Sequence, residues 1–201
     1  MNNYTLGIIW ALGRYVDKTQ SPNQYFFIRH NRKHFLEIVR QDLKLKSSIH
    51  TVTHRDKLQY RLKISGLDIT EIQRLGWSPR MSEQRCYPNI SGHKDFIRAY
   101  LEIHSSIDIV TIKRQRRRTR RQLRLRIYGN RYFLEQLNEN LASETGTGIK
   151  KVQQATLKSQ ISGILYYQSL VELRAIFNYL YRPPVQYFDR TYRALFYDQV
   201  N

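Results

Sequence analysis

The sequence predicts an α+β protein in which one α-β-β-α-β-β-α unit occurs twice within 201 residues. An apolar helical stretch with small residues, Tyr4–Asp17, returns in weaker form at Phe96–Asp108, which is an offset of 92 residues. A second helical stretch, Phe35–Leu43, returns as Phe133–Leu141 at an offset of 98 residues. Because the offset is nearly constant across helix, strand and helix, the pattern indicates an internal duplication.

A chain of this length can bury a substantial core, either as one domain or as two closely packed half-domains. The repeat divides the chain into a first half at residues 1–76, a linker at 77–91, a second half at 92–182 and a C-terminal tail at 183–201. The linker contains Pro79 and Pro88 among polar residues, which is typical of a connecting segment. The tail is rich in Tyr, Phe and Arg, and we expect it to form a small additional helix.

Side-chain periodicity predicts the remaining elements of both halves. In the first half these are a strand at 24–30, a helix at 31–43, strands at 49–55 and 58–65 around a turn at 56–57, and a helix at 68–75. In the second half they are strands at 107–115 and 121–129, a helix near 133–141, strands at 149–154 and 160–169, and a helix at 170–181. Strand 58–65 alternates strictly, so we expect an inward face made of Leu58, Tyr60, Leu62 and Ile64.

The charge is the unusual feature of the composition. Lys and Arg number 34 against 16 Asp and Glu, which gives a net charge of +18 and a pI near 10.2. Residues 1–91 and 92–201 carry +8 and +10, respectively. The division excludes a basic tail fused to a neutral domain, and it favours a polyanion-binding surface to which both halves contribute.

The cysteine and hydropathy patterns restrict the compartment. Cys86 is the only cysteine, so the chain has no internal disulfide and no cysteine-based metal site, and a reducing environment suits it. No apolar stretch approaches the length of a bilayer span, and the amino terminus lacks a secretion signal. We expect an intracellular protein, cytoplasmic or nucleoid-associated, with no membrane partner.

The most basic stretch, Lys113–Arg126, has nine cations and no acid. On its returning strand two leucines alternate with Arg124 and Arg126, so one face belongs to the core and the other presents guanidinium groups. A two-stranded ribbon fits the major groove of B-DNA, where Arg pairs with guanine and Gln or Asn pairs with adenine, while other arginines contact phosphates. The residues expected to contact DNA are Arg29, Thr51, Thr53, Arg55, Gln59, Arg61, Lys63, Lys113, Gln115, Arg116, Arg117, Arg118, Arg120, Arg121, Arg124, Arg126, Lys151 and Gln153.

This element order, with each half opening on an apolar helix that contains small residues, resembles the single-chain LAGLIDADG homing endonucleases over roughly residues 4 to 182. Against the family motif, residues 5–13 read TLGIIWALG and residues 97–105 read IRAYLEIHS. The resemblance implies a monomer in which the two motif helices pack at a pseudo-twofold axis and two antiparallel sheets form a saddle over double-stranded DNA. The small residues expected at the helix interface are Gly7, Ala11, Gly13 and Ala99.

The chain departs from the family at the residues that carry the chemistry. The resemblance implies that the last acid of each motif binds a divalent metal ion and drives phosphodiester hydrolysis, yet these positions hold Leu12 and His104. Leucine offers no oxygen ligand, and histidine is a poor ligand for Mg²⁺. Because two-metal hydrolysis requires carboxylates that hold the ions, we expect neither a bound metal ion nor a catalytic residue of the usual kind.

Other acids near the motifs leave an alternative open. His104 would act as a general base if Glu102 or Asp108 were its partner, whereas in the other interpretation it packs at the helix end or contacts a phosphate. Asp17, which follows Gly13 by four residues, is interpreted as a strand or turn residue in preference to a displaced metal ligand.

The sequence thus favours a pseudo-enzyme that binds double-stranded DNA without cutting it. Gene regulation is one role for such a protein, since degenerate copies of this fold are used by some bacterial transcription regulators. Two alternatives remain: an active site-specific endonuclease that uses Mg²⁺ with altered ligands, and an RNA-binding intron maturase, which the arginine run and the surface aromatic residues permit.

Overall fold

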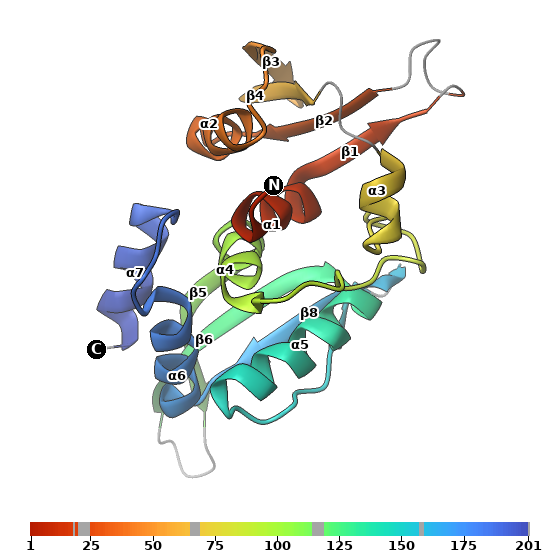
Figure 1. The fold of residues 1–201 in the computed structure, drawn as a ribbon. Helices are drawn as coiled ribbons and strands as arrows, with labels where there is room; N and C mark the ends of the chain where they lie inside the picture. The colour runs from red at the N-terminus through yellow and green to blue at the C-terminus, as the bar shows by residue number, and fades with distance from the viewer. Residues whose placement is uncertain (18, 20–24, 65–68, 114–118, 157–158, 201) are drawn as a thin grey trace.

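The computed structural model describes residues 1–17, 19, 25–64, 69–113, 119–156 and 159–200, and it contains two four-stranded antiparallel sheets (Figure 1). The first sheet has the order β1-β2-β4-β3, and the second sheet repeats this topology as β5-β6-β8-β7. The duplication predicted from the sequence is therefore present in the strand order. No helix in the described part of the chain is long and apolar enough to cross a bilayer.

The two motif helices, α1 (Asn3–Leu12) and α4 (His93–His104), lie side by side between the two sheets (Figure 1). The side chain of Asn2 caps α1 by accepting a hydrogen bond from the Thr5 backbone N–H at 2.8 Å. A Cβ atom on Gly7 would lie 2.5 Å from the Phe96 carbonyl oxygen and 2.8 Å from the Ala99 Cβ. Only glycine permits this approach, so the predicted roles of Gly7 and Ala99 at the helix interface agree with the geometry.

The other two predicted interface residues have different roles. Gly13 begins β1, where an added Cβ would meet the Ile9 carbonyl oxygen and the Phe26 ring, so it allows packing within the first half. Ala11 is half-buried, and its carbonyl oxygen lies 2.8 Å from the Nε2 atom of His104.

The predicted elements are present, with ends shifted by a few residues. The first half contains β1 (Gly13–Val16), β2 (Tyr25–His30), α2 (Lys33–Asp42), β3 (Ile49–His54), β4 (Lys57–Ile64) and α3 (Ile69–Arg74). The second half contains β5 (Ser105–Lys113), β6 (Thr119–Asn130), α5 (Arg131–Thr145), β7 (Gln153–Thr156), β8 (Ser159–Tyr167) and α6 (Leu170–Tyr181). The tail forms α7 (Arg190–Val200), which confirms the additional helix.

One hydrophobic core extends through both halves and includes Trp10, Ile28, Phe96 and Leu137. Each sheet contributes one face to this core, because residues on alternate strand positions point to opposite sides. The two halves therefore pack as one body.

The segment between α3 and α4 is more than a linker. Trp77 is buried against Phe26, with ring centroids 5.0 Å apart, and the Arg85 and Tyr87 side chains are also buried. The segment thus seals the interior beside α1, so its polar composition misrepresents its packing.

The tail joins the halves on another side of the central helices. Asp189, which precedes α7, forms an ion pair with Arg32 and lies 3.2 Å from the Nε2 atom of His34, and both of these residues belong to the first half. Arg98 of α4 donates hydrogen bonds to the carbonyl oxygens of Leu180 and Tyr187, both at 2.9 Å. These contacts tie the segment before α7 to both halves.

Two details of the hairpin formed by β3 and β4 differ from the prediction. Its turn is formed by Arg55 and Asp56, which have φ angles of 49° and 59°, and Lys57 is already in β4. Leu58 shares the core-side face of β4 as expected, but it is 62% exposed because it lies next to the turn, where it pairs with the exposed Thr53. Leu62 and Ile64 are buried as predicted.

Candidate nucleic-acid interface

The face of the first sheet that points away from the core is positively charged. The strand register pairs Arg29 with Arg61, and it places Arg14 and Lys63 on either side of Phe27. Directly paired residues share a face, so these four cations lie together, while Phe26, Ile28, Leu62 and Ile64 form the opposite, buried face.

Aromatic rings contact two cations of this face, Arg61 and Lys63. The Arg61 guanidinium lies 4.3 Å from the ring centroid of Phe27 and donates a 2.9 Å hydrogen bond to the Tyr25 hydroxyl. Lys63 lies 5.3 Å from the Tyr25 ring. Such contacts orient a cation without neutralising it.

No carboxylate of the described residues forms an ion pair with Arg14, Arg29, Arg61 or Lys63. Burial lowers the pKa of Arg29, and repulsion from Arg14, Arg61 and Arg55 lowers it further. The first sheet therefore presents positive charge that nothing in the described chain compensates.

The corresponding face of the second sheet contains an acid. The register pairs Asp108 with Arg124 and Ser106 with Arg126, so both arginines point away from the core as predicted. The Asp108 carboxylate accepts hydrogen bonds from Arg124 at 2.8 and 3.1 Å, and it lies 3.1 Å from Arg126. The hydrogen bond from Arg124 is the main reason why the pKa of Asp108 is lowered. Asp108 therefore neutralises part of this face.

Several other predicted DNA contacts have different positions from those expected. Thr51 and Thr53 pair with Tyr60 and Leu58, and Arg121 pairs with Thr111, so all three predicted contacts are on the core-side face of their strands. The prediction of an outward face was wrong for Thr51 and Thr53, which lie in a polar stretch where alternation carries little hydrophobic signal. Arg121 has the same strand parity as Leu123, so it follows the core-side face.

The remaining predicted contacts divide into three groups. Arg55 is exposed in the hairpin turn, and Gln59 shares the outward face with Arg61. Lys151 is exposed just before β7, and Gln153, exposed in β7, pairs with Ile164 and therefore shares the outward face with Tyr128. Gln115, Arg116, Arg117 and Arg118 lie outside the described residues, as do the side chains of Lys113 and Arg120.

The ends of α1 and α4 hold the two positions where the resemblance implies acids. His104 is half-buried, and its Nε2 atom lies 2.8 Å from the Ala11 carbonyl oxygen. Burial and the nearby Arg80 lower the pKa of His104 to about 4, so the imidazole is neutral at pH 7 and donates its Nε2 proton to this carbonyl. Leu12 is half-buried against the core.

The candidate acids do not converge on His104. Glu102 is 1% exposed and accepts hydrogen bonds from the hydroxyls of Tyr4 and Tyr181 and from the backbone N–H of Asp189. Burial raises the pKa of Glu102 to about 7. Glu102 thus has a structural role, and the general-base arrangement with Glu102 or Asp108 is not present.

Asp17 is the third acid that the sequence left open. Its side chain accepts a 3.0 Å hydrogen bond from the backbone N–H of Thr19, which is the geometry of a local turn. This contact agrees with the interpretation of Asp17 as a turn residue.

A pocket of about 510 Å³, here called the helix-end pocket, opens at the ends of α1 and α4. Its basic side chains are those of Arg14, Arg29, Arg80, Arg85 and His104, and no described residue in the lining is acidic. Sequence reasoning missed Arg14, Arg80 and Arg85, because two of them belong to the segment interpreted as a linker.

This lining does not fit a magnesium ion. Mg²⁺ requires oxygen donors, usually including carboxylates, whereas the pocket offers guanidinium groups and a histidine whose Nε2 atom is engaged. No group of three or more potential metal ligands occurs among the described residues. The positive charge of the lining therefore disfavours binding of a cation in this pocket.

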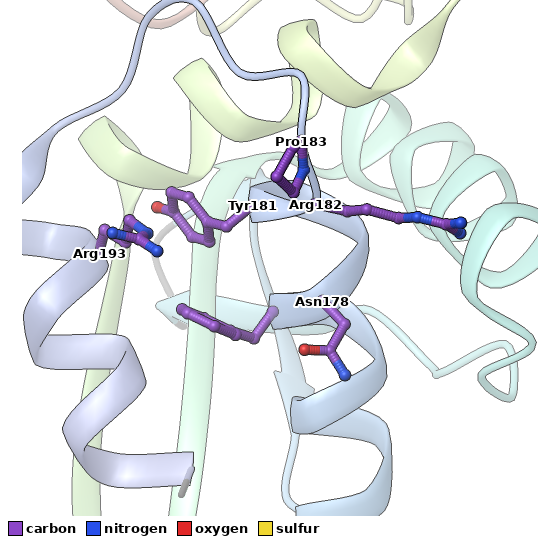
Figure 2. A pocket seen from close by; sticks show the side chains of 6 residues that line it. Asn178, Tyr181, Arg182, Pro183 and Arg193 are labelled. Atoms are coloured by element: carbon purple, nitrogen blue, oxygen red, sulfur yellow. The ribbon is translucent and has the colours of Figure 1, made fainter.

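A second pocket, of about 350 Å³, lies between α6 and α7. Figure 2 shows Tyr181 and Arg193 pointing toward one another, with the Arg193 guanidinium 5.9 Å from the Tyr181 ring centroid, while Arg182 points away. It contains none of the predicted site residues and is a gap where the tail helix packs against α6.

Comparison with known proteins supports the fold by structure alone. No protein-family model and no curated protein matches the sequence. The solved structures that are similar include the LAGLIDADG meganuclease I-CpaMI bound to uncleaved DNA, with a TM-score of 0.65 and 12% identity over 100% of this chain and 91% of that chain.

Two further structures agree. Meganuclease I-SmaMI bound to uncleavable DNA has a TM-score of 0.66 and 12% identity, over 100% of this chain and 90% of that chain. The I-LtrWI homing endonuclease bound to its target DNA has a TM-score of 0.62 and 13% identity, over 98% and 88%. The chain therefore has the fold of the LAGLIDADG homing endonucleases, as the resemblance of its motifs implied.

Proposed function

We propose that this protein binds double-stranded DNA with the outward faces of its two sheets and does not cut it. The observation that carries the proposal is the outward face of the first sheet, where four cations lie together without a described carboxylate partner. Similar structures of the same fold are bound to DNA, which supports duplex DNA as the polyanion.

The absence of cleavage is inferred from the donor chemistry at the ends of α1 and α4. Leu12 provides no ligand, the Nε2 atom of His104 is engaged by Ala11, and the pocket around them carries arginines. A metal-dependent hydrolysis would require carboxylates at this place. Binding without cutting suits a regulator, whose effect comes from occupying its site.

Duplex preference is tested by comparing the affinity for duplex DNA with the affinity for structured intron RNA at equal salt. We expect tighter binding to the duplex, with log affinity that falls steeply as log salt rises, by roughly 0.9 for each phosphate contact. A clear preference for RNA would instead favour the maturase alternative. Selection of bound sequences from random duplex DNA then identifies the target.

Cleavage is tested separately. The pure protein is incubated with a randomised plasmid library and Mg²⁺ or Mn²⁺, beside an active endonuclease of the same fold as a positive control. We expect the plasmids to remain intact in the presence of this protein. Site-specific nicking or cutting would establish the endonuclease alternative and overturn the second part of the proposal.

A further inference from the structure

Two of the basic groups of the helix-end pocket are already used by the fold. The Arg85 guanidinium is buried and donates hydrogen bonds to the carbonyl oxygens of Trp10 and Ser78, and His104 donates to the carbonyl oxygen of Ala11. Carbonyls in the last turn of a helix carry partial negative charge and lack helical partners. Arg85 and His104 therefore satisfy the end of α1, and neither is free to bind a ligand.

The other three cations have no compensating carboxylate in the described part of the chain. Arg14 and Arg80 are exposed and Arg29 is half-buried, and none of them pairs with a carboxylate in the described ranges. Their charges lie close enough to act on their neighbours: Arg14 contributes to the lowered pKa of Arg29, and Arg80 contributes to the lowered pKa of both Arg85 and His104. The pocket concentrates positive charge that an anion would neutralise.

The walls and the position of the pocket favour one kind of anion. Trp10, Leu12 and Trp77 form apolar walls, and a low-dielectric wall strengthens the field of the cations. Phe27 and Arg29 line the pocket and also belong to the outward face of the first sheet, so the pocket is continuous with the proposed DNA surface. A duplex lying on that surface would bring its backbone to the mouth of the pocket.

We infer that the helix-end pocket binds a phosphodiester group of the DNA backbone through Arg14, Arg29 and Arg80, at the place where the fold would otherwise hold metal ions. Guanidinium groups bind phosphate oxygens bidentately, which suits them to this ligand. The inference rests on the proposed function and deepens it. In place of metal ions that would hydrolyse the DNA backbone, the helix-end pocket would hold arginines that bind a backbone phosphate.

The first experiment uses duplexes of the selected target that carry one uncharged methylphosphonate at a time. Wild-type protein should lose about tenfold in affinity when the substitution falls at one or two positions near the centre of the site, because charge-assisted hydrogen bonds are lost there. Arg14→Gln/Arg80→Gln should bind the unmodified duplex more weakly, show a smaller salt dependence by about 0.9 for each lost phosphate contact, and lose less than about twofold at the same central positions.

The matched control is Arg74→Gln/Arg190→Gln, which removes two exposed arginines of α3 and α7 that do not line the pocket. This variant has the same net charge as the test variant, and it should keep the central penalty. A penalty that persists in Arg14→Gln/Arg80→Gln, or a scan without a central maximum, would overturn the inference while leaving duplex binding intact. A wild-type protein that binds no duplex overturns the proposed function itself.

The second experiment distinguishes a backbone phosphate from a free anion. The chain has two tryptophans, Trp10 and Trp77, and both line the pocket, so their fluorescence reports on it. Target duplex should change this fluorescence in the wild type and in the control variant, and the change should be absent from Arg14→Gln/Arg80→Gln. If inorganic phosphate at constant ionic strength saturates the signal while the methylphosphonate scan is flat, the pocket holds a free anion and the inference is wrong.

Discussion

The two sheets have the same strand order, and their registers correspond except for a shift between β7 and β8, but their outward faces have different electrostatics. On the first sheet Arg14, Arg29 and Arg61 lie without a described carboxylate partner, whereas on the second sheet Asp108 binds both Arg124 and Arg126. The outward faces of the two sheets therefore share their strand arrangement but differ in how much of their positive charge is paired with an acid. The difference teaches that a basic composition in both halves does not give their outward faces the same uncompensated charge.

The largest effect is expected from the first sheet. Arg29→Gln/Arg61→Gln should weaken duplex binding by about 3 kcal/mol, on the order of a hundredfold, since each charge-assisted hydrogen bond contributes about 1.5 kcal/mol or more. Removing the whole trio of the second sheet, in Asp108→Asn/Arg124→Gln/Arg126→Gln, should cost less. Affinities measured at two salt concentrations test this order, and equal losses would show that the carboxylate makes no difference.

The two motif helices also differ in charge at equivalent positions, since the apolar Trp10 of α1 corresponds to the acid Glu102 of α4. Burial raises the pKa of Glu102 to about 7, with Tyr4, Tyr181 and Asp189 as its hydrogen-bond partners and Arg98 as the nearby cation. Because the pKa of Glu102 is higher in the folded protein than in the unfolded chain, the neutral acid stabilises the fold. This stabilisation is complete below the pKa of the unfolded chain, near 4.3, and is lost as the pH rises through about 7.

The wild type should therefore lose stability between pH 4.5 and pH 8, whereas Glu102→Gln should not. The difference between their free energies of unfolding should change by about 2 to 3 kcal/mol in favour of the variant, because each pKa unit corresponds to about 1.4 kcal/mol. Urea unfolding at several pH values measures this difference. The control is Glu139→Gln, which replaces an exposed acid of α5 and should follow the wild type. A difference that does not change with pH would mean that Glu102 is ionised throughout this range.

The interface of the two helices tests what the halves share. Gly7→Ala should destabilise the fold by about 1 to 3 kcal/mol, because the new Cβ would meet the Phe96 carbonyl oxygen and the Ala99 Cβ. Adding Ala99→Gly should recover part of the loss, since it removes one of the two close contacts. Thermal unfolding measures both variants, and strictly additive losses would indicate that the helices separate instead of clashing.

The smallest expected effect comes from Asp108, and it tests directly whether this acid causes the difference between the two sheets. Asp108→Asn should strengthen duplex binding by about 1 kcal/mol, roughly fivefold, because it releases Arg124 and Arg126 from the carboxylate. Weaker binding would mean that Asp108 is required to orient these arginines toward DNA. Asp42→Asn, on α2 away from both faces, provides a control with the same change in charge.

Sequence reasoning worked where the signal is local and periodic. Strand 58–65 gave the correct faces for Leu62 and Arg61 because apolar and polar residues alternate, and α6 was predicted with its observed ends. It failed where both faces of a strand are polar, as at Thr51 and Thr53, since the pairing partner then decides the face. Composition misled in residues 77–91, where Trp77 and Arg85 are buried.

The sequence by itself determined the duplicated α+β fold, the close contact at Gly7, the excess of positive charge and the presence of Leu12 and His104 where the resemblance implies acids. These properties depend on residue identity and on periods of two or 3.6 residues, which are visible along the chain. The tertiary structure decided which cations have no carboxylate partner among the described residues, which of them pair with Asp108, and that Arg14, Arg29 and Arg80 lie together at the end of α1. The physical reason is that charge pairing and pocket formation depend on distances in space between groups that lie far apart in the sequence.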